Sequence, residues 1–84
     1  MKIAICDDQQ SFVERLCNLI TDKEADIHCF HFGNDLLNSE IIFDIVLLDI
    51  EMPETDGLSI AYQLYQRSRK TLIVVVKHFC NTTT

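Results

Sequence analysis

The stretch FDIVLLDIEMPETDGL, residues 43–58, decides the fold of this chain. Residues 43–48, which are apolar except for Asp44, read as a run of the kind found in strands that are covered on both faces of a sheet. The run ends abruptly in a carboxylate, Asp49, and Pro53 and the pair Asp56-Gly57 follow within a few positions. The meaning of that acid depends on which parts of the chain lie beside the end of the strand.

Strand-like and helix-like segments alternate along the rest of the sequence. The predicted elements are strand 2–6, helix 9–22, strand 26–32, helix 35–40, strand 43–48, helix 58–68 and strand 72–76. Asp8 is a candidate cap for the first helix, and Leu58, Ala61, Leu64 and Tyr65 repeat at helical spacing in the third. Right-handed crossovers between such elements predict an α/β fold, with a parallel sheet and helices on both of its faces.

Length and charge narrow the class of protein. The chain has 84 residues, enough for one small domain, and a net charge of −6, which disfavours nucleic acid and anionic lipid as partners. No apolar segment approaches membrane-spanning length, and Asp7-Asp8 interrupt the first apolar run far short of a signal-peptide core. We therefore expect a soluble, cytoplasmic protein that binds cations and basic protein surfaces, without membrane association.

The four cysteines, at positions 6, 17, 29 and 80, include no C-x-x-C pair. Their even number permits two disulfides, but Cys6 falls in a strand pattern and Cys17 in a helical one. Buried free thiols in a reducing compartment are the favoured interpretation.

Acids follow two of the predicted strands. Asp7 and Asp8 come just after the first strand, and Asp49 just after the third. If those strands are neighbours, the carboxylates converge, and two like charges about 4 Å apart repel by roughly 4 kcal/mol at an effective dielectric near 20. A bound Mg²⁺ removes that cost, since it prefers a few oxygen ligands and retained water. Asp49 can then act as a nucleophile toward phosphorus, with Asp7 and Asp8 holding the metal.

The segments IAICDD and FDIVLLDIEMPETDGL resemble the receiver domain of bacterial two-component response regulators, closest to those with a LytTR-type output domain. The resemblance covers residues 2 to about 76 and implies a flavodoxin-like doubly wound sheet. It implies that Asp49 is the phosphoacceptor and that Asp7 and Asp8 are metal ligands. It further implies a sensor histidine kinase as phosphodonor and a signalling module that assists its own phosphotransfer and dephosphorylation but is not an enzyme.

The same resemblance assigns roles in the loop after Asp49. The backbone carbonyl of Glu51 is expected to be a further Mg²⁺ ligand, and Pro53 and Gly57 are expected to shape the loop. One position departs from the family: Val76 stands where receivers carry Thr or Ser, whose hydroxyl contacts the phosphoryl group. Lys77 follows and is expected to point into solvent.

Residues 1–76 are predicted to be the N-terminal part of a receiver and residues 77–84 an unpatterned, frayed tail. The chain is expected to lack the fifth strand, with its phosphate-contacting lysine, and the final helices. Three explanations of this shortened receiver are compatible with the sequence: a natural truncation, a frameshifted product, or a piece cut from a longer chain. The alternative function is therefore a signalling-incompetent receiver fragment that self-associates through the apolar edge LIVVV, residues 72–76, as a dimer or by exchange of an element.

Two other chemistries are disfavoured. A zinc site at His28, Cys29 and His31 lacks ligand spacing, because His28 and Cys29 point to opposite faces of a strand. A phosphatase of the haloacid dehalogenase type requires D-x-D at its nucleophile, whereas Glu51 stands at the second position here.

Overall fold

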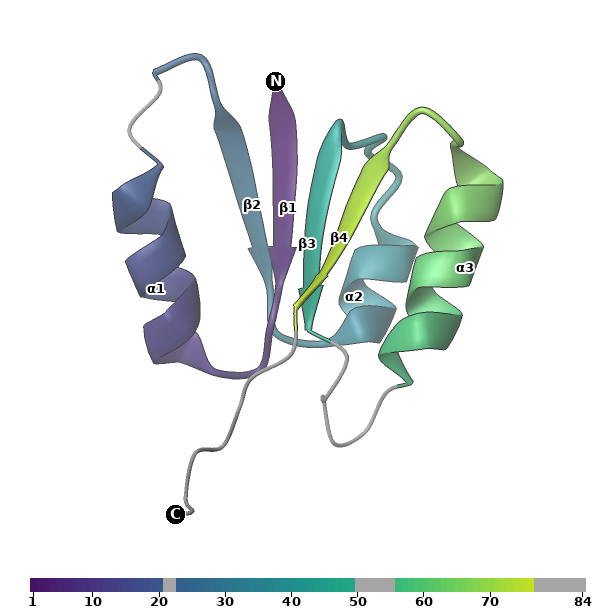
Figure 1. Ribbon diagram of the computed structural model, residues 1–84, viewed down its shortest axis with the longest axis horizontal. Coiled ribbons are helices and arrows are strands. Elements are labelled where there is room, and N and C mark those ends of the chain that lie inside the picture. Colours follow the sequence, from purple (N-terminus) through teal and green to yellow (C-terminus); the bar gives the residue numbers. More distant parts are fainter. Residues whose placement is uncertain (21–22, 50–55, 77–84) are drawn as a thin grey trace.

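Strands and helices alternate strictly along the chain in the computed structural model, which describes residues 1–20, 23–49 and 56–76. The elements are β1 (Lys2–Cys6), α1 (Gln10–Leu19), β2 (Asp26–Phe30), α2 (Gly33–Asn38), β3 (Ile45–Asp49), α3 (Gly57–Arg67) and β4 (Leu72–Val76) (Figure 1). This order matches the predicted succession of elements, with boundaries shifted by a few residues. Within the described residues, no helix is both long and apolar enough to cross a membrane.

The strands form one parallel sheet in the order β2-β1-β3-β4. β1 pairs with β2 on one side and with β3 on the other, so Ile3 has Ile27 and Ile45 as its two ladder partners. The chain therefore reverses its direction of travel across the sheet at β1. In sheets of this kind the site lies beside the carboxyl ends of the strands at such a switch point.

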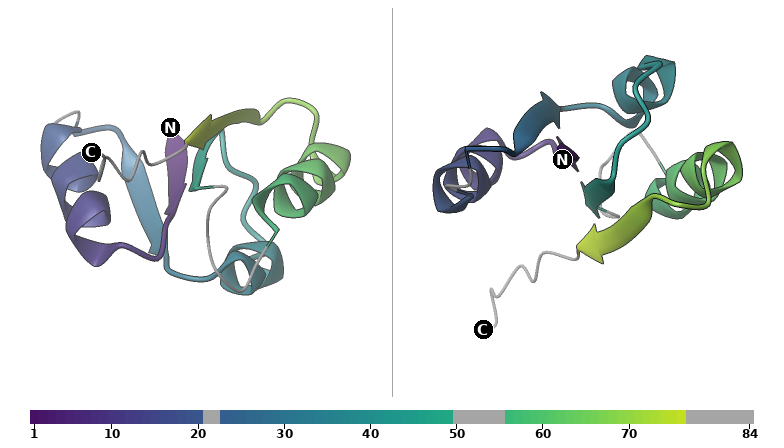
Figure 2. Two further views of the ribbon diagram at one scale, coloured as in Figure 1. Left: turned by 60° about the horizontal axis from the view of Figure 1, so that its bottom comes forward. Right: turned by 90° about the horizontal axis from the view of Figure 1, so that it is seen from above.

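The helices divide between the two faces of the sheet. α1 covers one face, while α2 and α3 lie together on the other (Figure 2). Because side chains alternate across a strand, Ala4 and Cys6 of β1 face the α2–α3 side and Ile3 and Ile5 face α1. The doubly wound α/β architecture predicted from the sequence is confirmed.

The two faces are packed unequally. The buried cluster on the α2–α3 side comprises Ala4, Cys6, Leu36, Phe43, Val46, Leu48, Ile60 and Leu64. On the α1 side the buried cluster is limited to Ile3, Ile5 and Val13, with half-buried neighbours around it. Most of the hydrophobic stabilisation in the described part of the chain therefore comes from the α2–α3 face.

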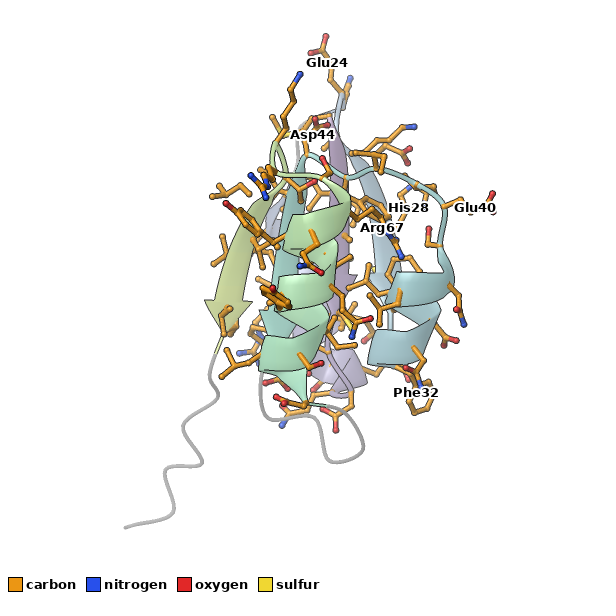
Figure 3. The ribbon with its side chains drawn as sticks, turned by 90° about the vertical axis from the view of Figure 1, so that its right-hand side faces the viewer. Glu24, His28, Phe32, Glu40, Asp44 and Arg67 are labelled. Carbon is orange, nitrogen blue, oxygen red and sulfur yellow. The ribbon has the colours of Figure 1, made fainter. Side chains whose placement is uncertain are left out.

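α2 and α3 are also joined by one forked side chain. Arg67, at the end of α3, donates from Nη1 to the carbonyl of Ser39 (3.0 Å) and from Nη2 to the carbonyl of Leu37 (2.6 Å) (Figure 3). Carbonyls at the end of a helix have no partner within it, and a cation suits that negative end. The contact fixes the two helices against each other at the end of the molecule remote from the carboxyl ends of the strands.

Three local details are decided by the structure, and the first of them corrects a prediction. Asp8 does not cap α1: its N-cap is Gln9, without a side-chain bond. Asp56 is the N-cap of α3, where its Oδ1 accepts from the Leu58 N–H at 3.1 Å. Leu58 and Tyr65, at the predicted helical spacing, are exposed, and Ile60 is buried instead.

Candidate metal centre

The acids at two strand ends meet because β1 and β3 are adjacent and parallel. Cys6 and Leu48 are ladder partners, so Asp7, the next residue after β1, and Asp49, the last residue of β3, occupy neighbouring positions. Both carboxylates are buried, with Asp7 1% and Asp49 2% exposed. The prediction that the two strand ends lie together is confirmed, with the correction that Asp49 belongs to the strand and does not follow it.

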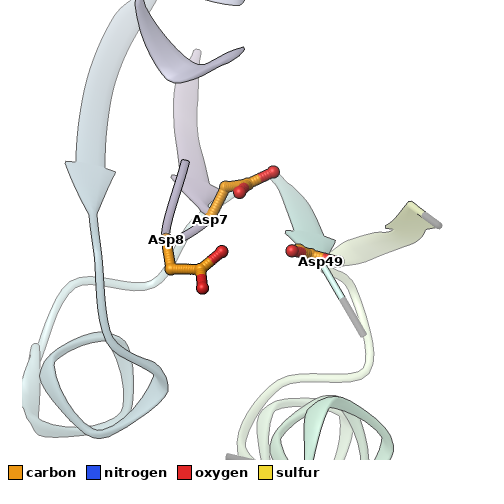
Figure 4. A group of neighbouring side chains, drawn as sticks. All are labelled: Asp7, Asp8 and Asp49. Atoms are coloured by element: carbon orange, nitrogen blue, oxygen red, sulfur yellow. The ribbon is translucent and has the colours of Figure 1, made fainter. Parts of the chain in front are cut away.

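Asp8 completes an acid cluster, defined as Asp7, Asp8 and Asp49. One carboxylate oxygen from each residue lies within 4.8 Å of the others, and Asp8 is exposed (Figure 4). Asp7 and Asp8 come from the segment after β1, and Asp49 comes from the end of β3. The cluster offers only oxygen ligands, a donor set suited to a hard divalent cation.

The backbone around Asp7 is held in place by β2 and α1. Its N–H donates to the carbonyl of Phe30 at 3.0 Å, and its own carbonyl lies 3.4 Å from His31 Nδ1. Its carboxylate Oδ1 accepts from the N–H of Gln9 at 2.8 Å. Sequence reasoning missed the partners Phe30 and His31, because contacts between residues so far apart in sequence leave no local signal.

Burial, together with the acid cluster, raises the pKa of a neighbouring thiol, that of Cys6. Burial, and then the charges of Asp7 and Asp49, raise the pKa of Cys6 to about 12. Cys6 precedes Asp7 and is fully buried between β2 and β3. Negative charge at this end of the sheet therefore makes the site attractive to a cation and keeps the adjacent thiol protonated.

Val76 lies beside Asp49. The two residues are partners in the β3–β4 ladder, and Val76 is half-buried. The position at which the sequence resemblance leads us to expect a hydroxyl is thus next to the predicted phosphoacceptor, but valine offers no hydrogen bond there. Gly57 is buried as the first residue of α3. Glu51, Pro53 and Lys77 lie outside the described residues.

The three residues weighed for zinc have separate surroundings. The His28 ring packs edge-on against Phe43, with Nε2 3.1 Å from Asp26, whereas Cys29 Sγ contacts Cys17 Sγ and His31 contacts the Asp7 carbonyl. Among the described residues, the acid cluster is the one group of potential ligands that come together. Asp7, Asp8 and Asp49 therefore form the candidate site.

A parallel α/β sheet with acids at the ends of its first and third strands defines a receiver-like domain. Residues 3–82 match the family model of the response regulator receiver domain, and the chain belongs to that family. It is 29% identical over 76 residues to the transcriptional regulatory protein DltR of Streptococcus agalactiae, a match that covers 88% of this chain and 34% of DltR. The chain thus spans about a third of the length of that curated relative.

Solved receivers share the fold. The BeF₃-activated receiver domain of DrrB, a Thermotoga maritima protein, superposes with a TM-score of 0.84 at 23% identity, over 96% of this chain and 68% of DrrB's. A response regulator, TrrA, solved in complex with the histidine kinase ThkA, gives a TM-score of 0.80 at 24% identity, over 99% of this chain and 73% of the other. The fold and the two-component signalling class predicted from the sequence are confirmed.

Proposed function

We propose that Asp49 is the phosphoacceptor of this receiver and that Asp7, Asp8 and Asp49 bind Mg²⁺. The observation that carries the proposal is the approach of the three carboxylates to within 4.8 Å in a chain of the receiver family. All three donors are carboxylate oxygens, and exposed Asp8 leaves room for metal-bound water. Both features favour Mg²⁺ over softer metals.

The reaction forms an aspartyl phosphate. A carboxylate oxygen of Asp49 attacks the phosphorus of a phosphohistidine, the P–N bond breaks, and the histidine nitrogen leaves with the electron pair. Mg²⁺, when bound, supplies neutralisation of the charge on the transferring phosphoryl group. Burial of Asp49 excludes water from one side of the nucleophile, while the ladder between β1 and β3 fixes its position relative to Asp7. The backbone carbonyl of Glu51 is proposed as an additional ligand.

A sensor histidine kinase is the proposed phosphodonor. The support is family membership and the likeness in fold to TrrA, which was solved in complex with a histidine kinase. Val76 provides no hydroxyl beside Asp49, so we expect slow phosphorylation and weak transmission of the phosphorylated state. A LytTR-type output domain stays a prediction of the sequence.

Phosphorylation can be tested with Mg²⁺ and acetyl phosphate, followed by intact mass measurement. The expected result is one phosphoryl adduct that Asp49→Asn abolishes. Asp44→Asn is the matched control: Asp44 lies at the opposite end of the sheet, where its Oδ2 accepts from the Lys2 N–H at 2.7 Å, and asparagine keeps an oxygen for that bond (Figure 3). An adduct that persists in Asp49→Asn would refute the assignment of the phosphoacceptor.

A second candidate function, self-association, is favoured by the surface of β4. Leu72 is 59%, Val74 38% and Val75 42% exposed, and within the described residues β3 is the ladder partner of β4. An apolar, β-branched strand edge of this kind recruits another strand, and we propose a second copy of the 84-residue chain. Val75→Lys is expected to shift sedimentation toward monomer, with Glu40→Lys as the control. A wild-type chain that sediments as monomer at high concentration would exclude this function.

A further inference from the structure

A pair of thiols lies on the side of the sheet opposite α2 and α3. The Sγ atoms of Cys17, on α1, and Cys29, on β2, are 3.3 Å apart, and both cysteines are free. A disulfide requires a separation of about 2 Å, so the two sulfur atoms already lie close to bonding distance. The contact joins residues from different elements, and neither cysteine belongs to the acid cluster.

Both thiols are accessible to a small oxidant. Cys29 is exposed and Cys17 half-buried, and together with Val13, Glu14 and His31 they line an open groove of about 480 Å³ between α1 and β2. Cys6, by contrast, is fully buried. The expectation that the cysteines are buried was therefore wrong for Cys29, because the α1 side of the sheet is only partly covered there.

Helix α1 has few buried contacts to hold it. Val13 is its one buried residue, and Leu19 at its end is 70% exposed. Among the described residues, α1 is the one helix on its face of the sheet, next to β2 (Figure 1). A covalent bond from Cys17 to Cys29 would tie this helix to the sheet edge and close a short loop, which restricts the unfolded chain.

We propose that Cys17 and Cys29 are a redox modification site that forms a reversible disulfide, a clasp between α1 and β2. The oxidant is a low-molecular-weight disulfide such as oxidised glutathione. One protein thiolate attacks it, which forms a mixed disulfide and releases one small thiolate. The second cysteine then attacks the mixed disulfide, the Cys17–Cys29 bond forms, and the second small thiolate leaves. The protons of the two protein thiols pass to the two released thiolates, so atoms and electrons balance.

The surroundings of Cys29 set the conditions of the test. Partial desolvation, and then the hydrogen bond with Cys17, raise the pKa of Cys29 to about 11, so its thiolate is scarce at neutral pH. Exchange is expected to be slow. The incubation therefore runs for hours before the reaction is quenched with acid.

The experiment uses the 84-residue chain with Cys80→Ser, which removes the thiol outside the described residues. After incubation with oxidised glutathione, intact mass and peptide mapping are expected to give a loss of two hydrogen atoms and a Cys17–Cys29 cross-linked peptide, both reversed by dithiothreitol. The cross-link is expected to raise Tm by roughly 10 °C.

Cys17→Ser and Cys29→Ser serve as matched variants in the same background. Each is expected to accept at most one glutathione on the remaining partner cysteine, without a rise in Tm. Stable glutathione adducts on Cys17 or Cys29 without the cross-link would overturn the proposal. A Cys17–Cys29 cross-link that leaves Tm unchanged would show that the disulfide does not tie α1 to β2. A cross-link to Cys6 would show that Cys17 and Cys29 are not the reactive pair.

Discussion

Asp49 and Val76 are partners in the β3–β4 ladder, so the buried carboxylate of the acid cluster has a methyl-bearing side chain at the next strand end. Each residue is the last of its strand. A phosphoryl group on Asp49 would find no donor at position 76, whereas a hydroxyl there could supply one. The effect of valine at position 76 on the phosphorylation of Asp49 can therefore be measured.

Val76→Thr is expected to increase phosphorylation by acetyl phosphate roughly tenfold, because one hydrogen bond to a charged group contributes about 1.5 kcal/mol or more. Time-resolved intact mass measurement gives the rate. Val75→Thr is the control, since its side chain points to the opposite face of the strand from that of Val76. Equal rates in the three proteins would show that position 76 does not limit the reaction.

Asp49→Asn is expected to stabilise the metal-free chain by about 1–2 kcal/mol, because it removes one of three like charges held close together. Urea titration in the presence of a chelator measures the change. Asp44→Asn, outside the cluster, should leave the free energy of unfolding nearly unaltered. A loss of stability in Asp49→Asn would mean that the carboxylates do not repel one another strongly.

Mg²⁺ is expected to raise the Tm of the wild-type chain, with about 2.7 kcal/mol of stabilisation at a concentration a hundred times the Kd. Asp7→Asn and Asp49→Asn should lose most of this response, since each removes a carboxylate of the cluster. Thermal unfolding with increasing Mg²⁺ provides the measurement, and Asp44→Asn is again the matched control. A response that survives both cluster variants would place the cation elsewhere.

The raised pKa of Cys6 predicts a loss of stability in alkali. The folded chain keeps this thiol protonated up to about pH 12, whereas the unfolded chain releases the proton near pH 9.0. The stabilising effect is therefore fully present below pH 9.0 and is lost as pH rises toward 12. Cys6→Ala should flatten this part of the stability curve, as measured by urea titration across the range. Parallel curves for the two proteins would contradict the shift.

Arg67→Ala is expected to destabilise the chain by about 1–2 kcal/mol, because it leaves the carbonyls of Leu37 and Ser39 without the guanidinium. Arg67→Lys keeps the charge but cannot reach both carbonyls with a planar pair of donors, so it should be more stable than Arg67→Ala but less stable than the wild-type chain. Arg15→Ala, on the exposed side of α1, is the control. Denaturant unfolding distinguishes the three, and a full recovery by lysine would indicate a purely electrostatic contact.

The sequence alone determined the succession of elements and indicated where the acid cluster lies. Apolar runs around Ile5 and Val46 predicted buried strands, and the acids at positions 7, 8 and 49 predicted a cation site at their ends. These features are local: each strand carries its own periodicity, and parallel strands bring their carboxyl ends to the same edge of a sheet.

Only the tertiary structure decided which side chains share an environment. Leu58, Leu64 and Tyr65 share a helical spacing, but only Leu64 of the three is buried. The packing of α3 against the sheet and α2 buries Ile60 beside it. The contact of Cys17 with Cys29 and the fork from Arg67 to α2 likewise join residues far apart in sequence. Such contacts depend on the position and angle at which each helix packs on the sheet. That arrangement is determined by the packing of whole faces, so neither segment carries a periodic signal of it.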